Sequence, residues 1–183
     1  MCMGTEIEAK LKVESLAEVE QRLQAGGAEF VAEQNQSDVY YDDPVRALAG
    51  GDRCLRVRLR VRHQQTANRQ EVVLTYKGPK QKDNFKKRLE LEVVVSDGET
   101  LEQILTELGY QRTITVKKRR RLWRQGQCLV ALDDVAGLGQ FVEIEGPDDR
   151  AIMAVQKGLG LDGVSHVNKG YSRLLAAKRE KGG

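Results

Sequence analysis

Charged and apolar residues alternate without a break along Glu6-Ile7-Glu8-Ala9-Lys10-Leu11-Lys12-Val13. The same period of two recurs in Leu55-Arg56-Val57-Arg58-Leu59-Arg60-Val61-Arg62 and in Phe141-Val142-Glu143-Ile144-Glu145. Successive side chains of a β-strand point to opposite faces of the sheet, so this period predicts strands with one charged and one apolar face. These stretches therefore indicate a protein built around a β-sheet.

Further strands and helices fill most of the remaining chain. Strands are expected at 72–77, 88–93, 115–123 and 129–133. In 115–123 we place Lys117, Arg119 and Arg121 on one face, although Lys118 and Arg120 put charge on the other face too. Apolar residues at helical spacing, with capping residues and glycines at their ends, predict helices at 15–26, 100–108, 148–159 and 170–178.

Composition limits the class of protein. The 183 residues fit one domain, which we place at 1–178, with a disordered tail at 179–183. A net charge of only +3 argues against a basic coat for nucleic acid. Three scattered cysteines without a CxxC pair argue against a disulfide framework and a zinc site. With no apolar run long enough to span a membrane, a cytoplasmic setting is expected.

The charged faces have two interpretations. An alternating strand usually turns its apolar side to the core and its charges to water, and for any single strand this interpretation stays open. The charges here, however, are grouped by sign, with four arginines ~7 Å apart along the strand at 55–62. Such like charges repel unless a polyanion or neighbouring glutamates neutralise them.

A closed barrel with its charges inside explains all the strands together. The apolar faces would then point outward beneath the helices at 15–26, 100–108 and 148–159. A dry tunnel lined by charges would be costly, whereas a hydrated tunnel that binds a highly charged ligand is not. This pattern therefore links the fold to a binding function.

Two sets of side chains would line this tunnel. The basic set comprises Lys10, Arg56, Arg58, Lys77, Arg88, Lys117 and Arg119, and the acidic set comprises Glu6, Glu8, Glu90, Asp133, Glu143 and Glu145. Arginine binds phosphate oxygens through two N–H groups, and lysine supplies a compact charge. Carboxylates supply the hard oxygen ligands that Mg²⁺ or Mn²⁺ prefers. Together they suit a metal–polyphosphate complex.

At these residues the sequence resembles the CYTH family, also called triphosphate tunnel metalloenzymes. The matching motifs are Glu6-Ile7-Glu8-Ala9-Lys10, Arg56-Val57-Arg58, Lys77, Arg88-Leu89-Glu90-Leu91-Glu92, Lys117-Lys118-Arg119, and a closing set of Asp133, Leu138-Gly139 and Phe141-Val142-Glu143-Ile144-Glu145. The motifs follow the family's order from Glu6 to about Tyr171, which is nearly the whole chain.

The resemblance implies an α+β fold: a closed eight-stranded antiparallel β-barrel, or tunnel, with a charged interior and helices outside. It implies metal binding by the acidic set, with Glu8, Asp133 and Glu145 as direct ligands, and triphosphate binding by the basic set. Arg88 and Glu90 are less defined members, because they could pair with each other. The residues expected to act in catalysis are Glu6, Glu8, Lys10, Lys77 and Arg119.

The resemblance favours an adenylate cyclase that converts ATP to cyclic AMP and pyrophosphate, with Mg²⁺ or Mn²⁺. Hydrolysis of inorganic tripolyphosphate or thiamine triphosphate stays open, as does a binder of polyphosphate or nucleotide without turnover. Nucleic acid is a weaker interpretation, because only alternate members of the basic run 117–121 share a strand face. No membrane partner is expected, and a homodimer is left open.

Overall fold

Eight strands close into a ring in the computed structural model, which describes residues 3–63, 68–81 and 85–182, without the side chains of 3–6, 86 and 182. The strands are β1 (Met3–Lys12), β2 (Glu29–Asp42), β3 (Cys54–His63), β4 (Arg69–Lys77), β5 (Lys86–Val95), β6 (Gln111–Gln125), β7 (Cys128–Val135) and β8 (Gly139–Glu145). Their order is β1-β5-β4-β3-β2-β6-β7-β8, every pair is antiparallel, and β1 closes the ring by pairing with both β5 and β8. The expected closed antiparallel barrel is confirmed.

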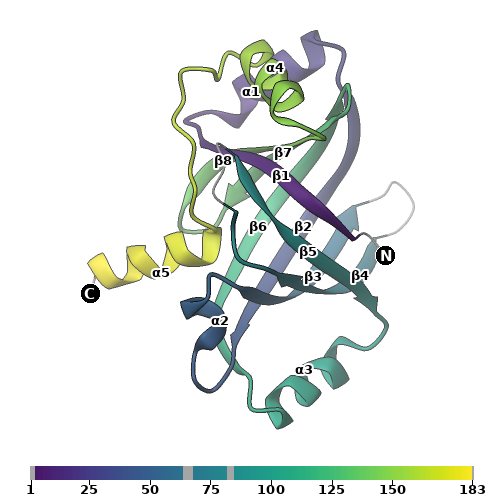
Figure 1. Ribbon diagram of the computed structural model, residues 1–183. Coiled ribbons are helices and arrows are strands. Elements are labelled where there is room, and N and C mark those ends of the chain that lie inside the picture. Colours follow the sequence, from purple (N-terminus) through teal and green to yellow (C-terminus); the bar gives the residue numbers. More distant parts are fainter. Residues whose placement is uncertain (1–2, 64–67, 82–84, 183) are drawn as a thin grey trace.

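Five helices lie outside the ring within the described residues (Figure 1). They are α1 (Leu16–Ala25), α2 (Ala47–Gly50), α3 (Gly98–Glu107), α4 (Asp149–Gly158) and α5 (Tyr171–Gly182). Ser15, Asp97 and Asp148 each accept a hydrogen bond from a backbone N–H of the first turn, which fixes where α1, α3 and α4 begin. Helix α5 continues to Gly182, so it includes residues 179–182, where the sequence predicted a disordered tail at 179–183.

Most of the hydrophobic core lies between the outer wall of the ring and the helices, while a smaller cluster of Val116, Val135, Phe141 and Tyr171 lies on the inner face beside α5. Helices α1 and α4 lie together at one end of the ring, and α3 lies at the other (Figure 1). Under α1 and α4, the outward residues Leu11, Val130 and Val142 pack with Leu23 and Ile152. The outward apolar faces predicted for β1, β7 and β8 are therefore covered as expected.

The helical cover is incomplete over β5, which differs from the expectation. Leu89 and Val93 on the outward face of β5 are 46% and 49% exposed. The core under α3 instead gathers Tyr41, Val57 and Leu105, on the β2 and β3 side of the ring.

The charged faces point inward. On β3, Arg58 is 8% exposed while its outward neighbour Leu59 is 39% exposed, which excludes the usual orientation with charges toward water. Strand β2 was not placed from the sequence, because its middle, residues 33–38, is polar on both faces. Gln34, Gln36 and Asp38 on its inner face are all buried.

The predicted orientation of β6 is wrong by one residue. Lys117 and Arg119 are exposed, whereas Lys118 is 6% exposed and lies inside with Arg120. The orientation is set by Trp123, which shares a face with Lys117 and Arg119 and packs in the outer core. A run of five basic residues has no contrast between its faces, so apolar residues outside the run decide its orientation.

Candidate functional site

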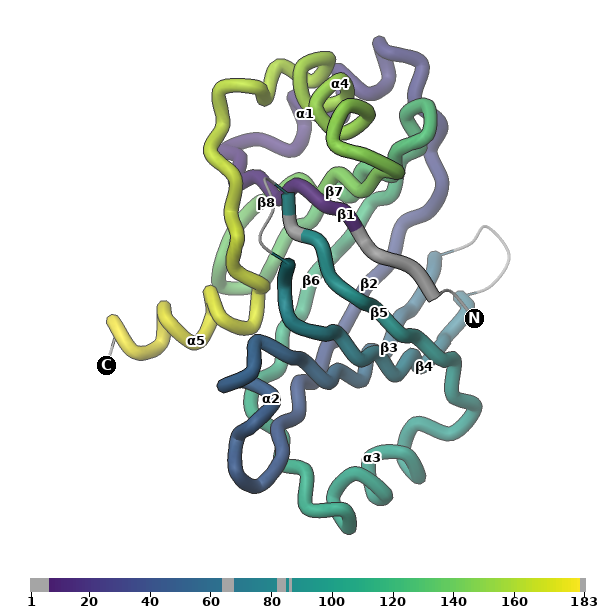
Figure 2. The backbone as a smooth tube through the Cα atoms, in the orientation of Figure 1, coloured from purple at the N-terminus to yellow at the C-terminus, as the bar shows by residue number. Residues whose placement is uncertain are grey.

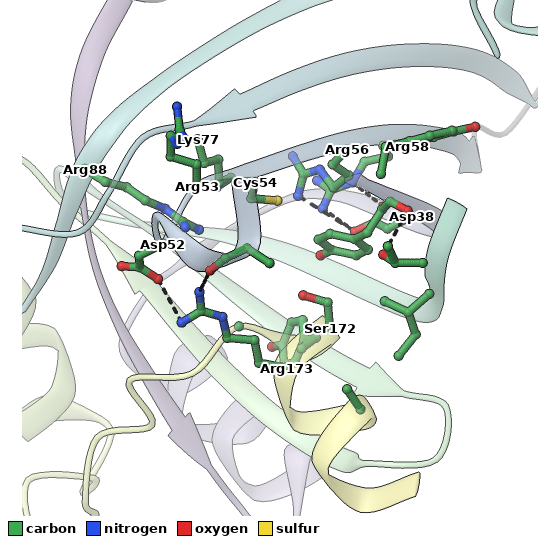
Figure 3. Close-up of a pocket in the computed structure, with 18 of the residues that line it drawn as sticks. Asp38, Asp52, Arg53, Cys54, Arg56, Arg58, Lys77, Arg88, Ser172 and Arg173 are labelled. Carbon is green, nitrogen blue, oxygen red and sulfur yellow. Dashed lines mark hydrogen bonds and ion pairs between the residues drawn. The ribbon is translucent and has the colours of Figure 1, made fainter. Parts of the chain in front are cut away.

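The ring encloses a cavity of about 1140 Å³ that is lined mainly by charged side chains. Its strand-borne cations are Lys10 on β1, Arg56 and Arg58 on β3, Lys77 on β4, Arg88 on β5, and Lys118 and Arg120 on β6. Segments around α2 and the first turns of α5 complete the wall (Figure 3). The alternation of these strands places every second side chain inside, which is why a short sequence pattern yields so dense a charge.

A buried carboxylate on β2 holds the two arginines of β3. Asp38 accepts hydrogen bonds from Nε and Nη2 of Arg58 at 2.6 Å and 2.7 Å, and its Oδ2 lies 3.7 Å from Nη1 of Arg56 (Figure 3). Burial works to raise the pKa of Asp38, but the charges of Arg58 and Arg56 hold this pKa well below its usual range. Asp38 therefore stays ionised and fixes both guanidinium groups.

The wall formed by β4 and β5 carries a second set of pairs. Nη2 of Arg56 lies 3.1 Å from Glu92, and Nζ of Lys77 lies 2.6 Å from Glu90. The pairing of Arg88 with Glu90 that the sequence left open is not present. Arg88 lines the cavity, and its buried Nε has no hydrogen-bond partner among the described residues.

A third cluster surrounds Asp133 on β7. This carboxylate is fully buried and accepts from Nε and Nη2 of Arg120 at 2.6 Å and 2.5 Å, from Lys118 at 3.2 Å, and from the hydroxyl of Tyr171 at 2.9 Å. Arg120 also donates to Glu143. Burial, aided by the charge of Arg120, lowers the pKa of Lys118 to about 8.

Carboxylates from β1 and β8 face each other across one strand pair. Glu8 is the direct partner of Glu145, and Lys10 is the direct partner of Glu143, with Nζ of Lys10 3.1 Å from Oε1 of Glu143 and 3.7 Å from Glu8. Like charges directly opposite on neighbouring strands destabilise a sheet unless a cation lies between them. Lys10 provides one such cation.

The expected metal ligands are only partly brought together. Glu8, Glu143 and Glu145 line the cavity from adjacent strands, and their carboxylate oxygens fit Mg²⁺ or Mn²⁺ in kind. In the described part of the chain, however, no three acidic, histidine or cysteine side chains stand as a preformed metal group. Asp133 is bound by cations, and Glu90 lies on the β5 wall beside Lys77. The side chain of Glu6 lies outside the described residues.

Sequence reasoning placed most of the charged lining that the strands contribute, but not all of it. The predicted residues that line the cavity are Glu8, Lys10, Arg56, Arg58, Lys77, Arg88, Glu90, Glu143 and Glu145. Lys117 and Arg119 lie outside the ring and are replaced by Lys118 and Arg120. Asp38 and Tyr171 were missed: Asp38 lies in a strand without apolar alternation, and Tyr171 reads as an apolar helix residue.

The comparison with protein families agrees with this geometry, because the CYTH domain model matches residues 4–171. The chain belongs to the CYTH family. A relative from Methanocaldococcus jannaschii, named "Putative adenylate cyclase", is 29% identical over 178 residues, which is 92% of this chain and 97% of the relative. A solved Pyrococcus horikoshii structure is 32% identical, with a TM-score of 0.81 over 95% of this CYTH chain and 99% of its own.

A more distant CYTH-like fold is also known. A Hippeastrum protein, described as having a dominant triphosphatase activity, has a TM-score of 0.68 at 15% identity, over 94% of this chain and 96% of its own. At this identity the likeness concerns the fold alone. Among the helices of the described segments, none has both the length and the apolarity that a membrane crossing requires.

Proposed function

We propose that this protein is a divalent-metal-dependent enzyme that acts on a triphosphate. The reaction we favour is the conversion of ATP to cyclic AMP and pyrophosphate. In that reaction O3′ of the ribose forms a bond to the α-phosphorus, and the bond between the α-phosphorus and the α–β bridging oxygen breaks. Pyrophosphate leaves with the electron pair of that bond, and the proton of the 3′-hydroxyl passes to pyrophosphate or to water. The observation that carries the proposal is the ring of inward lysines and arginines around the cavity.

The cations are arranged to receive several phosphate groups rather than one. Arg56 and Arg58 come from β3, Lys77 and Arg88 from β4 and β5, and Lys10 from β1 on the other side of β5 in the ring. Guanidinium groups held by buried carboxylates are pre-oriented, so little side-chain entropy is lost when phosphate binds. A triphosphate spanning this wall would neutralise charges that the protein's own acids only partly balance.

The metal in this proposal would be held by Glu8, Glu143 and Glu145. When bound there, Mg²⁺ or Mn²⁺ would neutralise phosphate charge and polarise phosphoryl oxygens. Of these carboxylates, Glu8 and Glu145 are direct partners across β1 and β8, which keeps two hard oxygen donors side by side.

The size and lining of the cavity favour a nucleoside triphosphate over an inorganic one. Beside its charged wall, the cavity is lined by Tyr40, Thr113 and Ile114, together with Ala49 and Ala176. Tyr40 and Ile114 are direct partners on β2 and β6, so they form one continuous surface. A base and ribose can occupy such an uncharged surface, whereas tripolyphosphate alone would leave it unused.

Hydrolysis of tripolyphosphate or thiamine triphosphate is the second candidate. The same cations would bind the same triphosphate, and the outcome depends on whether water or a ribose hydroxyl reaches the phosphorus. The Hippeastrum protein, which shares this fold, is described by its triphosphatase activity. A binder without turnover is the third candidate, although Glu8, Glu143 and Glu145 would only weaken anion binding in such a protein.

Product analysis distinguishes these candidates. The purified protein is incubated in parallel with ATP, tripolyphosphate and thiamine triphosphate, each with Mg²⁺, Mn²⁺ or EDTA. Cyclic AMP with an equal amount of pyrophosphate from ATP is the expected result. Free phosphate without cyclic AMP would assign the protein to the hydrolases, and tight binding without turnover in either metal would make it a binder.

A matched pair of variants tests the metal assignment. Glu8→Gln should abolish turnover while the protein stays folded, because the amide cannot supply the charge that a divalent cation needs. Asp134→Asn, on the outer face of β7, is the control and should keep full turnover. An active Glu8→Gln variant would remove Glu8 from the metal site.

A further inference from the structure

Tyr171, the first residue of α5, contacts one inward side chain from each of four consecutive strands of the ring. Its hydroxyl donates to Oδ2 of Asp133 on β7 at 2.9 Å, and its ring packs edge-on against Phe141 on β8, with centroids 5.1 Å apart. Nζ of Lys10 on β1 and Nζ of Lys118 on β6 lie 4.2 Å and 4.8 Å from the ring centroid. With 4% of its surface exposed, Tyr171 is part of the cavity wall rather than of the helix surface.

The chain before α5 is hydrogen-bonded to β1, which fixes the position at which the side chain of Tyr171 enters the ring. The segment from α4 to α5 runs down beside the ring (Figure 2). Within it, His166 forms a β-bridge with Leu11, and the backbone N–H of Val167 donates to the carbonyl of Lys10 at 2.7 Å. Tyr171 therefore begins its helix beside the same lysine that its ring contacts.

We propose that Tyr171 is a positioning residue whose ring holds the amino groups of Lys10 and Lys118 on the cavity wall in the arrangement that binds phosphate. The inference rests on the proposed function, because it concerns the same triphosphate site. It adds to this site a residue that the charge pattern does not reveal, and it gives the first turn of α5 a role in phosphate binding.

The physical reason is that an aromatic ring orients an ammonium group without neutralising it. Lys10 also lies beside Glu8 and Glu143, and Lys118 beside Asp133. Carboxylates that hold a lysine also offset its charge, which weakens its attraction for an incoming anion. The negative face of the Tyr171 ring attracts both ammonium groups but carries no net charge, so their charge stays available to an incoming anion.

The test is tripolyphosphate binding, measured by calorimetry on the full chain in EDTA and again in Mg²⁺. Tyr171→Leu, which removes the ring, should raise the dissociation constant by about 10- to 100-fold, since two desolvated cation–π contacts are lost. Tyr171→Phe, which keeps the ring and loses only the hydroxyl, should stay within about threefold of the parent protein. Tyr110→Leu is the matched control, because Tyr110 packs outside the ring with α3.

A double-mutant cycle separates positioning from mere folding. Tyr171→Leu should lose most of its effect on affinity in a Lys10→Met, Lys118→Met background, because the groups that the ring orients are then absent. An unchanged dissociation constant in folded Tyr171→Leu, an equal loss in Tyr171→Phe, or a full effect in the double background would each overturn the inference while the proposed function stands. Absence of tripolyphosphate and ATP binding by the parent protein would overturn both.

Discussion

Asp38 on β2 and Arg58 on β3 are direct partners across the two strands, and the carboxylate binds both Nε and Nη2 of the guanidinium, at 2.6 Å and 2.7 Å. Asp38 is fully buried, and its second oxygen also faces Arg56. A protein that concentrates cations in its interior must supply counter-charges that keep it folded when no anion is bound. Asp38 is one of these counter-charges, and Asp133, with Arg120 and Lys118, is another.

Replacing Asp38 by Asn should lower the free energy of unfolding by about 3 kcal/mol, because the buried guanidinium of Arg58 loses its counter-charge and Arg56 keeps only Glu90 and Glu92 among the described carboxylates. Tripolyphosphate should restore part of this loss, since its charge substitutes for the missing carboxylate. Urea unfolding with and without tripolyphosphate measures both effects. Asp134→Asn is the exposed control and should change stability by no more than about 0.5 kcal/mol. Equal stability of the two variants would contradict the structural role of Asp38.

The same pair predicts how stability depends on pH. The folded-state pKa of Asp38 lies well below its unfolded value, so its contribution is fully present above the unfolded pKa of about 4 and is lost as pH falls toward the folded pKa. The difference in unfolding free energy between the parent and Asp38→Asn should therefore be constant from about pH 5 to 7 and should shrink below about pH 4. Urea titrations over this range measure the difference, and a constant difference down to pH 3 would show that Asp38 is not held ionised by the arginines.

The closed ring and most of the charged side chains that its strands turn inward could be predicted from the sequence, because three strands carry unbroken alternation of charged and apolar residues. Glu8, Lys10 and Arg58 follow from that alternation together with one physical argument, the cost of a row of like charges. The family resemblance then supplied the number of strands. Nothing in a single alternating strand distinguishes inside from outside, so it was the grouping of charges by sign that decided the orientation.

The residues that the sequence analysis missed lie in segments whose two faces do not differ in polarity. The middle of strand β2 is polar on both faces, so neither the strand nor Asp38 stands out. In β6 the five consecutive basic residues agree with either orientation, and only Trp123 in the outer core fixes it. In the sequence, Tyr171 has the pattern of a core residue of an amphipathic helix. Its contact with two lysines depends on the pairing of the segment before α5 with β1.

The orientation of β6 can be tested directly with two neighbouring lysines. Lys118→Met should weaken tripolyphosphate binding by about 10- to 100-fold, as expected for losing a charge-assisted hydrogen bond inside the cavity. Lys117→Met removes the same charge one residue away on the outer face and should stay within about twofold. Calorimetry on both variants, with circular dichroism to confirm folding, makes the comparison. The reverse order of effects would restore the orientation expected from the sequence.

The ionisation of Lys118 predicts the pH dependence of that binding. Its ammonium group donates to Asp133 and interacts electrostatically with Arg120, Glu143 and Arg58, and burial together with the charge of Arg120 lowers its pKa to about 8. Below pH 8 the free protein carries the charge that phosphate needs, so affinity should not depend on this residue's ionisation there. Above pH 8 the free protein must take up a proton to bind, so affinity should fall by up to about tenfold per pH unit.

Lys118→Arg is the control that isolates this effect, because a guanidinium stays charged throughout the range. Tripolyphosphate gains charge of its own as pH rises, but it does so equally for both proteins. The dissociation constant of the parent protein divided by that of Lys118→Arg, measured by calorimetry from pH 6 to 9.5, should therefore be constant up to about pH 8 and should rise at higher pH. A flat ratio over the whole range would mean that Lys118 keeps its proton in the free protein, held by Asp133 more strongly than burial and Arg120 oppose it.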